Sequence, residues 1–356
     1  MRIMASAGHR KNSMKAIRLT DIGCLEIVEL PAPRIHGERD VLLRVEAVGI
    51  CGSDIHFFRT GNAGGRQIKF PFRIGHECVG AVIETGDSVL KVRAGDRVAV
   101  DPAVSCGECD QCKKGRRNTC RRLLFMGIPG EMDGCLAEYL LIPEASCHPL
   151  EAGMSIEQGV LVEPFSVSRY ALECIRQNGA KTIGILGAGP IGLGVLFCAR
   201  STGIQRIYVM DKLNYRLDRA TELGADWVGN PDRMDVVSRL LAIEPNSLDV
   251  VFECCGSQEA ISQGIDLLMP GGALVIIGIP ETDHVTLDPH LLRRKEISIY
   301  NIRRQNDCTD LTIQMVAEKP EIESLVTHSF SVDEAYRAFD TVAGYKDGVI
   351  KAVIKF

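Results

Sequence analysis

The sequence predicts an α/β protein in which a doubly wound parallel sheet is joined to a separate unit of β-strands. Two observations carry this prediction. Between residues 165 and 301, apolar strand-like runs alternate with helical stretches, which is the pattern of βαβ units in a parallel sheet. Residues 14–164 contain short β-type runs interrupted by glycine and proline, which is typical of a β domain with frequent turns.

The alternating region is expected to open with a strand at 182–186 and a helix at 191–201. Further strands and helices are expected in the same region, because short apolar runs continue to alternate with longer amphipathic ones. The other predicted strands are 206–210, 249–252, 273–277 and 296–300, and the other predicted helices are 217–223 and 259–268.

The last segment, residues 302–356, is expected to return to the first unit. Ser331 and Glu334 have the spacing of a capping box, so we expect a helix to begin there. The segment ends in a strand-like run at 349–356. Because it is short for an independent domain, we predict that it completes the β unit.

Length and composition narrow the class of protein. A chain of 356 residues fits two domains. The net charge of −5 without a basic block argues against a nucleic-acid partner, and no apolar run is long enough to span a membrane. Residues 1–13 have no apolar core of the signal-peptide kind, and we interpret them as a disordered leader. Fourteen cysteines without a secretory signal favour a reducing, cytoplasmic compartment.

A glycine-rich turn of the form G-x-G-x-x-G follows the first predicted strand of the parallel sheet and opens a helix. Such a turn lets the chain approach a pyrophosphate closely, and the free N–H groups of the helix face the phosphates. Asp211 lies 19 residues further on, at the end of the next strand, where its charge favours NAD over NADP. The alternative is a turn needed only for packing. The residues expected at the cofactor are Gly187, Gly189, Pro190, Ile191, Gly192 and Asp211.

Four cysteines, Cys106, Cys109, Cys112 and Cys120, fall within fifteen residues. Thiolates at this spacing suit a closed, tetrahedral zinc site with a structural role. Disulfides and an iron–sulfur cluster are the alternatives, and the close spacing without a following proline makes a cluster the weaker one.

Two short glycine-flanked motifs further upstream carry a second set of possible metal ligands. Cys51 is expected in a turn after one β-type run, and His76 with Glu77 in a turn after another. Taken singly, Cys51 would be a buried thiol and His76 a core histidine. Together the three residues offer three ligands and leave a fourth position for water or substrate, which is the arrangement of a catalytic zinc.

These motifs resemble those of the zinc-containing medium-chain dehydrogenases, within them the sorbitol or polyol dehydrogenase branch. The resemblance runs from Met14 to Phe356 and also includes a Val162-Glu163-Pro164 motif. It implies that residues 14–164 and 302–356 form a GroES-like catalytic domain and that residues 165–301 form a Rossmann NAD-binding domain. The active site would lie in the cleft between the two domains.

The resemblance also assigns roles to single residues. It implies that Glu163 joins Cys51, His76 and Glu77 at the catalytic zinc, directly or through water, and that Asp54 orients His76. Ser53 would accept the substrate proton and pass it on through His56, whose simpler interpretation is a surface histidine. Further cofactor contacts are implied for Arg216, Ile277, Gly278, Ile279, Arg303 and Arg304. Substrate contacts are implied for Phe57, Glu163, Arg304 and Gln305.

The predicted activity is hydride transfer from a secondary alcohol of a polyol to NAD, giving a ketose, with two zinc ions per chain. A rival of the same class is an L-threonine 3-dehydrogenase or another zinc alcohol dehydrogenase. A different class is a non-catalytic relative that only binds NAD, which the complete ligand set argues against. Phe57 and Gln305 stand where the sorbitol enzymes have tyrosine, so the polyol is not named. On resemblance alone, a homotetramer or homodimer is expected.

Overall fold

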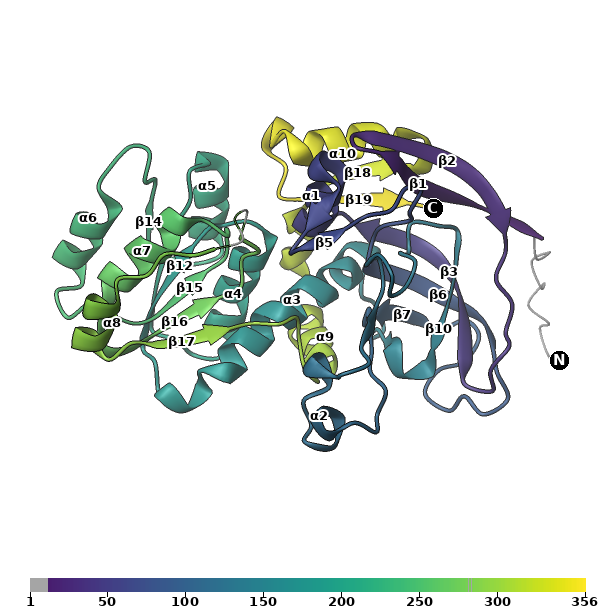
Figure 1. The fold of residues 1–356 in the computed structure, drawn as a ribbon, viewed down its shortest axis with the longest axis horizontal. Helices are drawn as coiled ribbons and strands as arrows, with labels where there is room; N and C mark the ends of the chain where they lie inside the picture. The colour runs from purple at the N-terminus through teal and green to yellow at the C-terminus, as the bar shows by residue number, and fades with distance from the viewer. Residues whose placement is uncertain (1–11, 281, 283) are drawn as a thin grey trace.

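The computed structural model describes residues 12–280, 282 and 284–356. Figure 1 shows two units, a parallel-sheet unit on the left and a β-rich unit on the right, with helices α3 (Ile156–Cys174) and α9 (Thr309–Ala317) between them. The predicted leader lies outside the described residues as far as residue 11. Among the described residues, no helix combines the length and the apolar character needed to cross a membrane.

The left unit contains a six-stranded sheet in which all neighbouring strands are parallel. The strand order is β14-β13-β12-β15-β16-β17, which is the order of a doubly wound dinucleotide-binding fold. The predicted fold class is confirmed for this region. The bounds are β12 (Thr182–Leu186), β13 (Arg206–Met210), β14 (Trp227–Gly229), β15 (Leu248–Glu253), β16 (Leu268–Ile276) and β17 (Ser298–Asn301).

Helices connect these strands and cover the sheet, as the parallel pairing requires. The central strands are buried on both faces, and two apolar clusters lie on either side of them. This explains why the strands are nearly continuous apolar runs rather than alternating ones. The helices of this unit are α4 (Pro190–Ser201), α5 (Asn214–Glu222), α6 (Val236–Ile243), α7 (Gln258–Leu267) and α8 (Pro289–Lys295).

The right unit is built on a seven-stranded sheet of order β11-β7-β6-β3-β19-β18, with β10 also paired to β3. Its strands are mostly antiparallel, and one large apolar cluster fills the space beneath them. A hairpin of β1 (Ser13–Asp21) and β2 (Cys24–Pro31) adds a second layer. The sheet strands are β3 (Asp40–Gly49), β6 (Glu77–Thr85), β7 (Arg97–Val100), β10 (Tyr139–Pro143), β11 (Cys147–Pro149), β18 (Val326–Ser331) and β19 (Lys351–Lys355).

The C-terminal segment completes this sheet, as predicted. Strand β19 pairs antiparallel with β3, with Val353 opposite Gly49. The predicted capping box at Ser331 and Glu334 is present and opens a short 3-10 turn that leads into α10 (Ala335–Ala343). Helix α10 packs beside α1 (Gly52–Thr60) above the sheet (Figure 1).

Helix α3 differs most from the sequence-based expectation. The predicted domain boundary at 164/165 falls in the middle of this 19-residue helix. Pro164 lies inside the helix, although proline lacks an N–H and disfavours helix in the residue before it. The helix nevertheless continues, since Ser155 and Gln158 form a capping box at its start and one long face is buried.

Short elements fill the remaining loops. They include helix α2 (Asp110–Lys113), the pair β4 (Asn62–Ala63) and β5 (Arg66–Gln67), and the pair β8 (Ala103–Val104) and β9 (Leu124–Phe125). The 3-10 turns are η1 (Arg117–Thr119), η2 (Glu144–Ser146), η3 (Arg176–Asn178), η4 (Pro320–Leu325), η5 (Val332–Glu334) and η6 (Lys346–Gly348).

Candidate active site and metal centres

Three of the predicted ligands of the catalytic zinc meet at the ends of two paired strands. Glu77 begins β6 and pairs with Gly49 at the end of β3, two residues before Cys51. Cys51 then caps the start of α1, so its segment is a helix start rather than the turn expected from its glycines. One ligand atom from each of Cys51, His76 and Glu77 lies within 4.8 Å of the other two. The sheet register therefore assembles the cluster.

Asp54 holds the two ligand-bearing segments together. Its side chain is 2% exposed. One carboxylate oxygen accepts the N–H of Cys51 at 3.0 Å, and the other accepts the N–H of Gly75 at 3.1 Å. The nearest ring nitrogen of His76 is 3.7 Å away, too long for a hydrogen bond. Asp54 thus fixes the backbone on both sides of the cluster, and its predicted role in orienting His76 stays a prediction.

Glu77 has a partner that the sequence did not predict. Both of its carboxylate oxygens accept hydrogen bonds from Lys351 Nζ, at 2.8 and 2.6 Å. Lys351 Nζ also donates to the carbonyl of Ile50 at 3.2 Å. Glu77 and Lys351 are 1% and 2% exposed. The only signal in the sequence was a lysine within the apolar final strand, where a buried cation needs an anionic partner.

Glu163 lies in the middle of α3 and is not part of the close three-residue cluster. Burial raises the pKa of its carboxyl to about 8, with the charge of His76 opposing the shift and that of Glu77 adding to it. The carboxyl is therefore within electrostatic reach of the cluster. Its predicted contact with zinc, direct or through water, stays a prediction.

The remaining predicted residues of this segment lie on α1. Ser53 and His56 are half-buried, and among the described residues no hydrogen bond joins their side chains. The relay through them stays a prediction. Phe57 is 1% exposed and packs in the apolar cluster of the β-rich unit. Its ring is enclosed by that cluster, and its predicted substrate contact stays a prediction.

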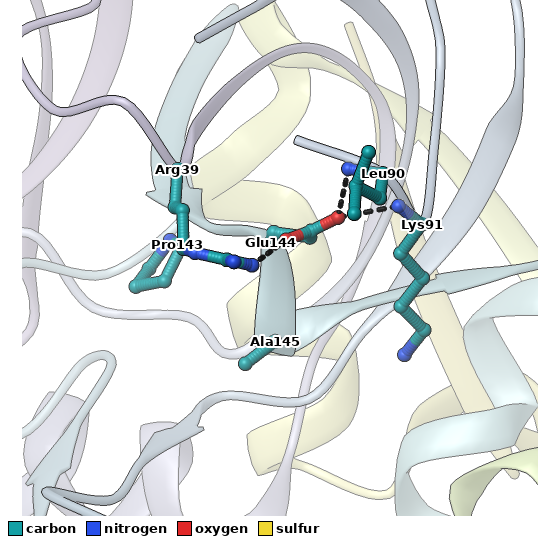
Figure 2. A pocket seen from close by; sticks show the side chains of 6 residues that line it. All are labelled: Arg39, Leu90, Lys91, Pro143, Glu144 and Ala145. Carbon is teal, nitrogen blue, oxygen red and sulfur yellow. Dashed lines mark hydrogen bonds and ion pairs between the residues drawn. The ribbon is translucent and has the colours of Figure 1, made fainter. Parts of the chain in front are cut away.

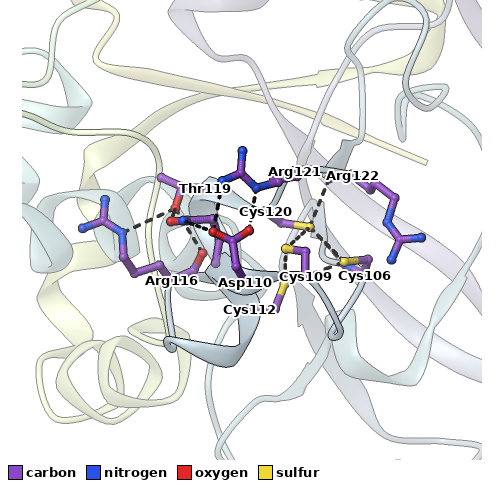
Figure 3. Close-up of polar contacts among 10 residues, drawn as sticks. Cys106, Cys109, Asp110, Cys112, Arg116, Thr119, Cys120, Arg121 and Arg122 are labelled. Carbon is purple, nitrogen blue, oxygen red and sulfur yellow. Dashed lines mark hydrogen bonds and ion pairs between the residues drawn. The ribbon is translucent and has the colours of Figure 1, made fainter.

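The four cysteines of the lobe converge on one point (Figure 3). Neighbouring Sγ atoms are separated by 3.4, 3.6, 3.8 and 4.0 Å. Four thiolates placed about 2.3 Å from one zinc ion would stand about 3.8 Å apart at the corners of a tetrahedron. A disulfide would need about 2.05 Å, and all these cysteines are free. The lobe therefore fits a single tetrahedral metal ion.

Backbone groups of the lobe support thiolates at these positions. The N–H groups of Cys106 and Arg122 donate to Cys120 Sγ at 3.3 and 3.4 Å. Hydrogen bonds from the backbone of Glu108 and Cys109 lower the pKa of the Cys106 thiol to about 6. A thiolate is the form that binds zinc, so these backbone groups favour the ligand form at Cys106. Burial acts in the opposite direction at Cys112 and raises the pKa of its thiol to about 11.

The glycine-rich turn has the geometry that a dinucleotide site needs. Gly187 has a φ of 99°, which disfavours any other residue. A Cβ placed on Gly192 would lie 1.8 Å from the carbonyl oxygen of Gly187, so the turn could not close around a larger residue. Gly189 caps α4, and Pro190 is its first residue, followed by Ile191. The N–H groups of this helix end are thereby presented at the carboxyl edge of the sheet.

Asp211 ties this turn to the end of β13. One carboxylate oxygen accepts the N–H of Ala188 at 2.6 Å, and the other accepts the N–H of Leu213 at 2.8 Å. Arg216 Nη1 lies 3.8 Å from Asp211 and 3.5 Å from the position that a Cβ on Gly189 would take. The predicted residues Asp211 and Arg216 therefore lie together beside the turn.

The predicted cofactor segment at residues 277–279 faces the β-rich unit. The loop holding Ile277, Gly278 and Ile279 follows β16, and Ile279 is half-exposed there. A Cβ placed on Gly64, in the loop between β4 and β5, would lie 3.9 Å from Ile279 Cγ2. The two units thus approach each other at the predicted nicotinamide side.

One aromatic ring, that of Phe125, lies between Arg304 and the metal cluster. The guanidinium carbon of Arg304 lies 3.4 Å from the centroid of the Phe125 ring, and that ring lies 5.4 Å from the imidazole of His76. Burial, with the charge of Arg303 adding to it, lowers the pKa of Arg304 to about 10, so the side chain stays cationic near neutral pH. Its Nη1 is buried and has no hydrogen-bond partner among the described residues.

The neighbours of Arg304 are placed differently. Arg303 is exposed, and its carbonyl accepts a hydrogen bond from Asn118 at 3.1 Å. The amide of Gln305 donates to Asp101 at 2.6 Å, and its oxygen accepts the N–H of Cys308 at 2.9 Å. Since both ends of the Gln305 amide are engaged in the fold, its predicted substrate contact has less support than that of Arg304.

A separate surface pocket of about 410 Å³ contains none of the predicted site residues (Figure 2). At its centre, Glu144 accepts the N–H groups of Leu90 and Lys91 and pairs with Arg39 at 2.9 Å. These contacts satisfy the carboxylate within the protein. The pocket is therefore a feature of loop packing.

Two family models match the chain. An alcohol dehydrogenase GroES-like domain matches residues 37–152, and a zinc-binding dehydrogenase domain matches residues 190–318. A sorbitol dehydrogenase of Bacillus subtilis is 32% identical and covers 96% of this chain and 97% of its own length. An L-idonate 5-dehydrogenase of Vitis vinifera is 35% identical, and the match covers 94% of this chain and 93% of that protein.

Solved structures agree with the same assignment. A zinc-binding dehydrogenase from Sinorhizobium meliloti, bound to NADP, has a TM-score of 0.88 at 30% identity and covers 97% of this chain and 100% of its own. An alcohol dehydrogenase from Escherichia coli, complexed with NADH, has a TM-score of 0.88 at 27% identity with the same coverage. The two neighbours differ in the nicotinamide cofactor that they hold.

Proposed function

From the premise that the chain belongs to the zinc-binding alcohol dehydrogenase family, as its motifs predicted, we propose that it oxidises a secondary alcohol of a polyol with NAD. The product is the corresponding ketose. The observation that carries the proposal is the close cluster of Cys51, His76 and Glu77 in a chain that also has a complete dinucleotide turn. Zinc and a nicotinamide dinucleotide are the cofactors of this family.

A zinc ion held by Cys51, His76 and Glu77 would supply Lewis acidity to the substrate oxygen. Lys351 contributes by balancing the charge of Glu77, so the donor set as a whole carries less negative charge. Ligands with less total negative charge neutralise less of the charge of the zinc ion, so the ion would polarise a bound oxygen more strongly. Asp54 keeps the backbone of both ligand segments in place, which lets the cluster act without rearrangement.

A hydroxylated substrate suits the groups around the cluster. Arg304 offers a buried N–H donor that has no hydrogen-bond partner in the described part of the chain, and Glu163 offers a carboxyl whose pKa burial raises to about 8. A buried donor left without a partner is costly, and a second hydroxyl of a polyol would satisfy it. Simple monohydric alcohols have no such group, so the proposal favours polyols.

The substrate is tested by steady-state rates with xylitol, sorbitol, L-idonate, a simple secondary alcohol and L-threonine. We expect NADH formation with at least one polyol at a kcat/KM well above that of the simple alcohol. Turnover of L-threonine without turnover of any polyol would overturn the polyol assignment in favour of an L-threonine 3-dehydrogenase.

The choice of NAD rests on Asp211. Its carboxylate lies beside the glycine turn and would repel a 2′-phosphate, although Arg216 stands 3.8 Å away and weakens that repulsion. We expect kcat/KM to be higher with NAD than with NADP, and Asp211→Ala to narrow the difference. Equal efficiency with both cofactors in the unaltered enzyme would contradict the role given to Asp211.

Two further properties belong to the proposal. A cytoplasmic location is supported by two metal sites whose thiolates need a reducing compartment. A homotetramer or homodimer is supported by β17, which lies at the edge of the six-stranded sheet and offers unpaired backbone groups. Light scattering after size exclusion measures the assembly, and a monomeric mass would contradict it.

A further inference from the structure

The loop between α10 and β19 carries an exposed tyrosine in an uncommon backbone conformation. Tyr345 is 54% exposed and has a φ of 51°, and Asp347 in the same loop has a φ of 52°. Residues other than glycine rarely adopt these angles, and they persist when the surroundings hold them there. The contacts of this loop should therefore explain why it keeps these backbone angles.

The ring of Tyr345 meets an arginine of the other domain. The guanidinium carbon of Arg216, on α5, lies 5.2 Å from the Tyr345 ring centroid and 5.9 Å from that of Tyr215. Both distances are within the range of cation–π interactions. The arginine thus has one aromatic neighbour from its own domain and one from the catalytic domain.

A second contact joins the same two segments. Tyr215 Oη donates a hydrogen bond to the carbonyl of Val349 at 3.1 Å, so α5 holds the far end of the loop as well. A Cβ placed on Gly348 would stand 4.0 Å from the Tyr215 ring. Together these contacts fix the position of Tyr345 relative to Arg216.

The other side of Arg216 faces the dinucleotide turn. Its Nη1 lies beside Asp211 and Gly189, and its Nε is buried without a hydrogen-bond partner among the described residues. The guanidinium is therefore held between two rings and the Asp211 carboxylate, without a hydrogen bond to Nε among the described residues. The planar guanidinium of Arg216 therefore stays beside Asp211, at the end of the dinucleotide site where the adenosine is expected.

We propose that Tyr345 is a cofactor-positioning residue, which reaches from the catalytic domain to hold Arg216 at the adenosine end of the dinucleotide site. Binding of the adenosine half then depends on both domains, and not on the Rossmann domain alone. The inference rests on the dinucleotide site of the proposed function but is independent of which alcohol is oxidised.

The experiment compares Tyr345→Ala with Tyr345→Phe in the full-length protein and uses AMP and NADH as probes. The alanine variant is expected to raise the dissociation constants of both about five- to tenfold, because the ring face that holds Arg216 is lost. The phenylalanine variant keeps that face and is expected to stay within about twofold of the unaltered protein. The KM for NAD should rise while kcat at saturating NAD is unchanged.

Tyr336→Ala is the matched control, since Tyr336 is an equally exposed tyrosine of the catalytic domain whose ring contacts Phe58 and not Arg216. It should leave both dissociation constants unchanged. Unaltered AMP and NADH binding in Tyr345→Ala would overturn the proposal and leave Tyr345 as a packing residue. A loss in Tyr345→Phe as large as in Tyr345→Ala would also overturn it.

These outcomes separate the inference from the proposed function. A protein that binds AMP and NADH but oxidises no polyol would refute the proposed activity alone, and the Tyr345 variants would still decide the inference. A protein that oxidises polyols while Tyr345→Ala binds AMP normally would refute the inference alone.

Discussion

The two metal-binding clusters of this protein are built in opposite ways. The cysteine lobe takes its four ligands from fifteen consecutive residues at the surface, and backbone N–H groups of the same loop support them. The catalytic cluster takes Cys51, His76 and Glu77 from two strand ends, and it depends on Lys351 from the last strand of the chain. The lobe is thus a local structure, whereas the catalytic cluster is a product of the whole fold.

This difference predicts which property, metal binding, stability or activity, each substitution should change. A change in the lobe should affect the lobe, its metal and the stability of nearby loops. A change at the catalytic cluster should affect activity first, and a change at its distant supports should affect both the fold and the metal. Four substitutions, ordered by the size of their expected effect, test this contrast.

The largest effect is expected for Cys51→Ala. Loss of a ligand removes the catalytic zinc, and the loss of Lewis-acid assistance should lower kcat/KM about a thousandfold or more. The melting temperature should change little, and the zinc of the lobe should remain. Cys109→Ala is the matched variant in the lobe, for which we expect a lower melting temperature with the catalytic zinc retained. Steady-state kinetics, calorimetry and metal analysis check both, and equal loss of both metals in either variant would contradict the contrast.

Lys351→Met is expected to act through the fold. It leaves Glu77 as a buried charge without its partner, which should lower the free energy of unfolding by about 3–5 kcal/mol. Urea denaturation measures this loss. The double variant with Glu77→Gln removes both charges and should recover part of the stability but not the activity. If Lys351→Met were as stable as the unaltered protein, the buried pair would not support the cluster as described.

Asp54→Asn is expected to weaken the catalytic zinc site without unfolding the chain. The neutral side chain can no longer accept both the Cys51 and the Gly75 N–H groups. Loss of such support around metal ligands lowers metal affinity about 10- to 100-fold. Competition with a chelator measures the affinity, and the lobe serves as the internal control. A zinc affinity equal to that of the unaltered protein would show that Asp54 has no positioning role.

The smallest effect is expected for Arg121→Ala in the lobe. Arg121 pairs with Asp110 at the surface, at 2.5 Å. Arg121 holds both carboxylate oxygens, yet solvent screens exposed pairs, so the loss of this pair should cost little stability. Zinc content and melting temperature should both match the unaltered protein. A marked loss of zinc would mean that the lobe depends on side-chain charges as well as on its backbone.

The same contrast explains how much could be predicted from sequence. The cysteine lobe and the glycine turn are local, so their spacing alone indicated the ligands, and the alternation of strands and helices predicted the parallel sheet. The predicted boundary between residues 164 and 165 falls inside α3, because tertiary packing carries this helix through Pro164. Lys351 and Tyr345 escaped notice, since each acts only after the C-terminal segment has returned to distant partners.

The three residues with implied substrate contacts besides Glu163 lie in different surroundings. The resemblance implied substrate contacts for Phe57 and Gln305, yet Phe57 lies in an apolar cluster and Gln305 is bonded to Asp101 and Cys308. The resemblance implied a substrate contact for Arg304 as well, and only the Phe125 ring lies between its guanidinium and the imidazole of His76. Different tertiary contacts around each side chain separate the three residues, and no local pattern encodes them.

The central claim is tested most directly by measuring zinc content and polyol oxidation together while the more exchangeable zinc is removed with a chelator. The catalytic cluster has three close protein ligands and the lobe has four thiolates, so the catalytic zinc should leave first. Our account predicts that zinc falls from two ions per chain to one as NADH formation from xylitol or sorbitol disappears, and that added zinc restores both. Full activity at one zinc per chain, with the remaining ion in the lobe, would contradict it.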